Sequence, residues 1–149
     1  MNTSLPPAIR DRILSSVEAQ FDAQIEFTKE LVRFPSVRGN EAPVQDFIHA
    51  ALATRGYAMD RWRVREEDIR HHPGFSPIAV SYEQAWCVVG THRPREEKGR
   101  SLIMNSHIDV VPSGPVDMWA DHPFDPKVKD GWLYGRGGAD MKAGTAMNV

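Results

Sequence analysis

The order of the predicted elements indicates a layered α/β domain, an open sheet with flanking helices. Two helical patterns come first, one ending at 33–36 and one spanning 40–56, and three strand-like runs follow at 57–64, 85–90 and 101–106. A glycine-rich turn then leads into a further helix near residue 141. The chain has 149 residues, 41% hydrophobic and 26% charged, which is enough to bury a core.

The first helix is predicted by apolar residues at three- and four-residue steps. The stripe consists of Leu14, Val17, Phe21, Ile25, Thr28 and Val32. The helix ends before Pro35, because a residue that precedes proline is pushed out of the helical region. For the second helix we expect Asn40 as the N-cap, Pro43 in the first turn and Gly56 in a left-handed conformation at the end.

The three strand-like runs differ in character. Residues 57–64 alternate imperfectly, which favours an edge strand or a bulge over a central position. Residues 85–90 and 101–106 are apolar runs typical of buried strands, and the polar link between them predicts an antiparallel hairpin. The one cysteine, Cys87, lies in the first of these two runs, where we expect a buried small hydrophobe and neither a disulfide nor a zinc ligand.

Charge and hydropathy exclude several classes of partner. The net charge is −2 and the pI is near 6.3, so nothing favours binding to nucleic acid or to an anionic membrane. No run approaches the ~18 apolar residues of a membrane span. The first 14 residues lack the basic start and the apolar core of a signal peptide. We therefore expect a cytoplasmic protein.

A histidine and an aspartate follow the third strand-like run. His107 and Asp109 are two residues apart, so in extended backbone their side chains leave the same face. In that arrangement His107 binds a metal ion through one imidazole nitrogen while Asp109 accepts a hydrogen bond from the other, which sets the tautomer and the ring direction. The end of a strand is also where open α/β sheets place their ligands.

A second carboxylate, Asp140, follows the glycine cluster Gly135, Gly137 and Gly138. Glycines permit a positive φ and a close backbone approach. A carboxylate placed there can bridge two divalent ions about 3.5–4 Å apart. The alternative is that Asp140 caps the helix beginning at Met141. A dinucleotide site is disfavoured, because Asp140 occupies the last glycine position of that fingerprint and would repel a pyrophosphate.

The other histidines give weaker signals. His71 and His72 are adjacent, so in extended chain they point to opposite sides; a solvated or substrate-side loop is favoured over a metal site. His49, His92 and His122 are interpreted as structural or solvated. There is no Gly-x-Ser-x-Gly motif, so serine hydrolysis has no support.

Three motifs carry a family resemblance: SHIDVVP at 106–112, PFDP at 123–126 and DGWLYGRGGADMK at 130–142. They resemble the acetylornithine deacetylase/succinyl-diaminopimelate desuccinylase family, cytoplasmic dizinc amidohydrolases related to aminoacylase and the glutamate carboxypeptidases. The resemblance implies that His107 is a ligand of one metal, that Asp140 bridges both, and that Asp109 lies beside His107 as a catalytic residue. It implies two divalent ions, with zinc favoured and cobalt as a substitute.

The same resemblance implies parts that residues 1–149 do not contain: a Glu-Glu pair, a further acidic ligand, a late histidine and a small dimerisation domain. We therefore expect a partial catalytic domain of a longer, homodimeric hydrolase that cleaves an amide bond of an N-acyl amino acid or small peptide, and no activity from this chain alone. The alternative is a genuine short binding or regulatory module that retains a partial metal site. Four residues, His71, His72, Trp119 and Arg136, are candidates for substrate specificity.

Overall fold

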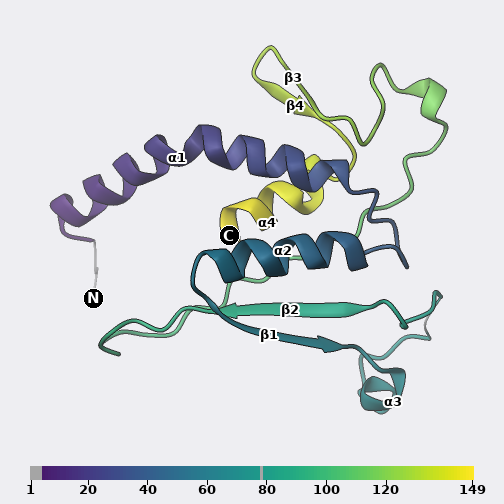
Figure 1. The fold of residues 1–149 in the computed structure, drawn as a ribbon, viewed down its shortest axis with the longest axis horizontal. Coiled ribbons are helices and arrows are strands. Elements are labelled where there is room, and N and C mark those ends of the chain that lie inside the picture. Colours follow the sequence, from purple (N-terminus) through teal and green to yellow (C-terminus); the bar gives the residue numbers. More distant parts are fainter. Residues whose placement is uncertain (1–4, 78) are drawn as a thin grey trace.

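The computed structural model describes residues 5–77 and 79–149, so the first four residues of the segment tested for a signal peptide lie outside it. Figure 1 labels its helices and strands. The helices are α1 (Pro7–Arg33), α2 (Ala42–Thr54), α3 (Glu66–Ile69) and α4 (Ala143–Asn148), with short helical turns η1 (Val116–Met118) and η2 (Gly138–Lys142). The strands are β1 (Ala58–Arg63), β2 (Trp86–Thr91), β3 (Lys127–Lys129) and β4 (Trp132–Tyr134).

Helix α1 ends where the sequence predicts, because Phe34 precedes Pro35 and is extended (φ −80°, ψ 118°). The buried residues of α1 all lie near its C-terminal end: Thr28 and Val32 of the predicted stripe, and Leu31 beside them. The earlier stripe residues Leu14, Val17 and Phe21 are exposed. Figure 1 shows the reason: the first half of α1 extends past the other elements and has nothing to pack against.

Helix α2 begins with Pro43 in its first turn and is followed by Gly56 at φ +79°, both as predicted. The predicted N-cap is wrong. Glu41 occupies the cap position, and the side-chain amide of Asn40 instead donates to the Pro35 carbonyl at 3.0 Å. The Asn40 amide therefore ties the start of α2 back to the end of α1.

The two longer strands form one antiparallel pair. β1 pairs with β2 from Ala58↔Thr91 to Arg63↔Trp86, so the predicted edge position of 57–64 is confirmed. The predicted hairpin between 85–90 and 101–106 is wrong, because β1 is the partner of β2 and 101–106 forms no strand. The predicted burial of 101–106 is also wrong: Leu102 is 80% exposed and Ile103 89%. Apolar composition alone specifies neither burial nor a strand partner.

The β3–β4 hairpin is an element that the sequence reading missed. It joins its strands through Asp130 (φ +51°) and Gly131 (φ +78°), the two positive-φ residues that a tight two-residue turn demands. The hairpin leads directly into the glycine-rich turn at 135–140 (Figure 1).

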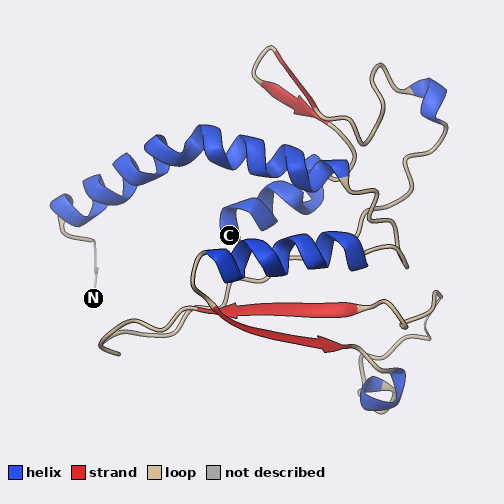
Figure 2. Cartoon of the chain, viewed as in Figure 1, coloured by secondary structure: helices blue, strands red, loops and turns tan. Residues whose placement is uncertain are grey.

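One hydrophobic core connects these elements. α2 packs on β1 and β2, while α1 packs against α4 and η2 (Figure 2). The buried cluster draws on all of these helices and on the segment before β3: Leu31, Val44, Ile48, Leu52, Ile108 and Ala146. Helices and antiparallel strands in one packed unit confirm the α/β class. The core thereby brings Ile108 and α4 to the C-terminal end of α1.

Two smaller features complete the description. Cys87 lies on β2 opposite Trp62, is half-buried, and burial raises the pKa of its thiol. Within residues 5–77 and 79–149, no helix combines the length and the apolar character needed to cross a bilayer.

A pair of alanine substitutions tests this packing. Leu31→Ala empties a fully buried position, so we expect the free energy of unfolding to fall by about 2–5 kcal/mol. Ile103→Ala removes an exposed side chain and should change it by less than about 0.5 kcal/mol. Urea denaturation followed by circular dichroism measures both. A loss at position 103 as large as that at 31 would show that the 101–106 run is buried after all.

Candidate metal centre

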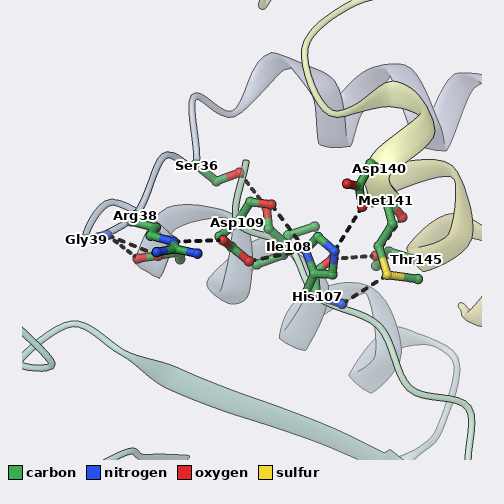
Figure 3. A network of polar contacts seen from close by, with 10 residues as sticks. Ser36, Arg38, Gly39, His107, Ile108, Asp109, Asp140, Met141 and Thr145 are labelled. Atoms are coloured by element: carbon green, nitrogen blue, oxygen red, sulfur yellow. Dashed lines mark hydrogen bonds and ion pairs between the residues drawn. The ribbon is translucent and has the colours of Figure 1, made fainter. Parts of the chain in front are cut away.

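Buried neighbours position the backbone of His107. Ile108 and Val110 are buried, and the Val110 N–H donates to the Ser36 carbonyl at 2.9 Å. The Thr145 hydroxyl donates to the His107 carbonyl at 3.2 Å. With its backbone held on both sides, His107 turns a half-exposed imidazole toward Asp140 (Figure 3).

The imidazole of His107 lies between two carboxylates. Its Nδ1 is 3.2 Å from both the side-chain Oδ1 and the backbone carbonyl of Asp109, and its Nε2 is 3.0 Å from Asp140 Oδ1. A neutral imidazole carries one N–H, so it can donate to one of these neighbours only. If Nδ1–H donates to Asp109, the Nε2 lone pair faces an anion. In that tautomer a metal ion between Nε2 and Asp140 would separate the lone pair from the anion, whereas in the other tautomer Nε2–H donates to Asp140.

The turn before Asp140 depends on Gly137. Its φ of +79° lies in the left-handed region, and a Cβ at this position would collide with the side chain of Val110. Asp140 itself is extended (φ −124°, ψ 97°), and its carboxylate is 86% exposed. α4 begins only at Ala143, without a side-chain cap, so the helix-cap interpretation of Asp140 is wrong.

Lys142 lies beneath this turn and is fully buried. Its Nζ donates to the Phe34 carbonyl at 2.7 Å. Burial lowers the pKa of this ammonium from 10.5 to about 8. A cationic side chain is therefore held inside the protein, immediately behind the loop that carries Asp140.

Two arginines border the same cavity, a pocket of about 510 Å³. Arg38 is exposed, with its Nε 3.7 Å from Asp109 Oδ2. Arg136 lies over the Trp119 ring at 5.1 Å, and its Nη2 is 3.4 Å from the Ser113 carbonyl. The pocket thus combines His107 and two carboxylates with two positive charges. Sequence reasoning missed Ser36, Arg38 and Lys142 as members of this site.

The remaining histidines do not line this pocket. His72 Nδ1 accepts the Gly74 N–H at 3.1 Å, and His122 Nδ1 accepts the Phe124 N–H at 3.3 Å. The His92 ring packs near Tyr57, with centroids 6.0 Å apart. These contacts agree with the structural or solvated interpretation of His92 and His122.

The donor atoms fit part of a metal site. Nitrogen and oxygen ligands each ~2.0–2.1 Å from a tetrahedral zinc ion lie about 3.3 Å apart. His107 Nε2 and Asp140 Oδ1 are separated by 3.0 Å, so a small movement of either side chain would admit an ion. Across residues 5–77 and 79–149, no group of three or more His, Cys, Asp or Glu side chains gathers to hold one ion. His107 thus lies between Asp109 and Asp140, but the three side chains do not surround one point where an ion could bind. Their roles toward a metal stay predictions.

Comparison with known families identifies the class of protein. The family model described as peptidase family M20/M25/M40 matches residues 103–149, the stretch that carries His107, Asp109 and Asp140. We therefore assign the chain to this peptidase family, in agreement with the resemblance seen in its motifs.

Two similar proteins of known name are both succinyl-diaminopimelate desuccinylases. The chain is 35% identical over 127 residues to the succinyl-diaminopimelate desuccinylase of Stenotrophomonas maltophilia (strain R551-3), which covers 85% of this chain and 28% of that protein. It is 35% identical over 122 residues to the enzyme of the same name from Marinobacter nauticus, over 82% of this chain and 27% of the relative. The chain thus spans little more than a quarter of the length of these relatives.

A glycine pair tests the construction of the turn. Gly137→Ala introduces left-handed strain of about 1–2 kcal/mol and, because its Cβ meets Val110, a further packing cost of about 1–3 kcal/mol. Gly114→Ala is the matched control: its φ is +73° but no atom lies near the added Cβ, so only the strain is expected. Chemical denaturation measures both variants. Equal losses at 114 and 137 would contradict the close approach of Val110 to the turn.

Proposed function

We propose that the protein hydrolyses the amide bond of an N-acyl amino acid at a centre that holds two divalent metal ions, zinc in the first place. One observation carries the proposal: His107 Nε2 faces Asp140 Oδ1 at 3.0 Å while Asp109 holds Nδ1. Membership of a peptidase family and the desuccinylase relatives support the reaction class.

Each of the three residues has a separate task. His107 binds a metal ion through Nε2, and Asp109 accepts the Nδ1–H, which selects the tautomer and aims the ring. Asp140 would hold the metal through its carboxylate. When bound, the ions polarise the amide carbonyl and lower the pKa of a coordinated water toward ~7. Arg38 neutralises the outer oxygen of Asp109 and helps to keep that carboxylate in place.

The charges of the pocket support a class of substrate. Arg38 and Arg136 border the cavity beside the candidate metal ligands, and guanidinium groups are well suited to carboxylates. Relatives are named for the removal of a succinyl group, which ends in a carboxylate. We infer that the acyl-amino acid substrate is anionic, with N-succinyl amino acids as the first to test.

The proposal also concerns the rest of the protein. We propose that residues 1–149 form part of a catalytic domain and are inactive alone, since the described residues bring only two metal ligands together. Homodimerisation and a cytoplasmic location stay predictions.

The first experiment uses protein expressed from its complete gene. We expect release of succinate from N-succinyl-diaminopimelate, loss of this activity on treatment with a chelator, and recovery on addition of Zn²⁺ or Co²⁺. His107→Ala and Asp140→Ala should each weaken zinc binding by at least about 100-fold, more than is typical for a residue outside the ligand shell. Calorimetric titration and a succinate assay measure these effects.

The matched control is His92→Ala, which removes an exposed histidine that does not line the pocket. It should retain zinc affinity and activity. Full activity after removal of metal, or wild-type zinc affinity in His107→Ala, would contradict the proposed centre. Hydrolysis of N-acetyl substrates in preference to N-succinyl ones would contradict only the inference that the acyl group carries a carboxylate.

A further inference from the structure

We infer that Ser36 and Lys142 are positioning residues, which set the separation of the His107 imidazole and the Asp140 carboxylate by tying both to one short segment. This segment, residues 34–38, follows α1, and Figure 3 shows its Ser36 and Arg38 next to Asp109. The inference rests on the proposed metal centre and assigns residues that hold its two ligands in register.

The first tie connects the segment to the backbone around Asp109. Ser36 is fully buried, and its hydroxyl donates to the Ile108 carbonyl at 2.7 Å. Its own carbonyl accepts the Val110 N–H at 2.9 Å, beside a single parallel bridge between Val37 and Val110. These bonds hold the chain on both sides of Asp109, at Ile108 and Val110, and Ile108 directly follows His107.

The second tie connects the same segment to the Asp140 turn. Lys142 Nζ donates to the Phe34 carbonyl at 2.7 Å. The backbone N–H of Lys142 donates to the Gly137 carbonyl at 2.9 Å, which closes the turn on which Asp140 stands. A shift of Phe34 relative to this turn would therefore break a buried hydrogen bond and leave an ammonium without a partner, which is costly.

The two ties meet at one atom. The Phe34 carbonyl accepts both Lys142 Nζ at 2.7 Å and the Ser36 N–H at 2.8 Å. The two halves of the site also contact each other directly. His107 Nε2 lies 3.0 Å from Asp140 Oδ1, the Thr145 hydroxyl donates to the His107 carbonyl at 3.2 Å, and the His107 N–H contacts the Met141 sulfur at 3.4 Å. The route through the Phe34 carbonyl differs from these contacts because the side chains at its two ends, Ser36 and Lys142, are fully buried.

The chemical nature of Lys142 also favours a positioning role. An apolar side chain of similar length would fill the same space without the cost of burying a charge, and buried charges often add less stability than apolar replacements do. What the ammonium provides is a directional bond to a particular carbonyl. Such a bond sets the distance between Phe34 and the turn, which packing alone leaves free to vary.

The test compares Ser36→Ala and Lys142→Met in protein expressed from its complete gene, with Co²⁺ as the probe. Each variant should bind Co²⁺ about 10–100-fold more weakly, the usual effect of losing a group that orients a ligand. Each should also change the visible absorption spectrum of the bound Co²⁺, because the ligand geometry changes. The double variant should lose no more affinity than the weaker-binding single variant, because both act through one segment.

Leu52→Ala is the control for a merely structural effect. Leu52 lies on α2, is buried in the hydrophobic core and does not line the pocket. The substitution should lower the melting temperature yet keep the wild-type Co²⁺ affinity and spectrum. Wild-type affinity and spectrum in both Ser36→Ala and Lys142→Met would overturn the inference, as would an equal spectral change in Leu52→Ala. Ser36→Ala decides alone if Lys142→Met does not fold. Absence of Co²⁺ binding by the wild-type protein would instead overturn the proposed metal centre on which the inference rests.

Discussion

The buried contact between the Lys142 ammonium and the Phe34 carbonyl joins parts of the chain 108 residues apart, and the arrangement of the site depends on it. On one side lies the end of α1, which Pro35 terminates and which holds Ile108 and Val110 through Ser36. On the other lies the turn that presents Asp140. The core needs only apolar groups to form; the alignment of these two parts needs directional bonds as well.

The second constraint is electrostatic. One imidazole nitrogen of His107 lies 3.2 Å from Asp109 and the other lies 3.0 Å from the Asp140 carboxylate. With Nδ1–H donating to Asp109, the Nε2 lone pair and the Asp140 carboxylate would both be free to bind a metal ion. Because the Asp140 side chain is largely exposed, further ligands have access to the same point. The family match covers the stretch that carries both residues, and their role as metal ligands stays our proposal.

Short-range sequence patterns predicted the helices, because the spacing of apolar residues and the capping residues are read within one or two turns. Periodicity and capping signals located α1 and α2, and the candidates chosen by residue chemistry, His107, Asp109 and Asp140, lie next to one another in the structure. The β3–β4 hairpin was missed although Asp130-Gly131 between two apolar-containing runs is a strong turn signal. The predicted pairing of β2 with residues 101–106 was wrong, because the composition of a strand does not specify its neighbour. The buried contacts of Ser36 and Lys142 could not be predicted, since their partners lie 72 and 108 residues away, although Lys142 stands in the motif at 130–142.

The central claim is that His107 and Asp140 hold divalent ions together. X-ray absorption at the zinc edge, on zinc-loaded protein from the complete gene, tests it most directly. We predict imidazole scattering that decreases in His107→Ala, and a zinc–zinc distance of about 3.5–4 Å that is lost in Asp140→Ala. A zinc spectrum that neither substitution alters would contradict the claim.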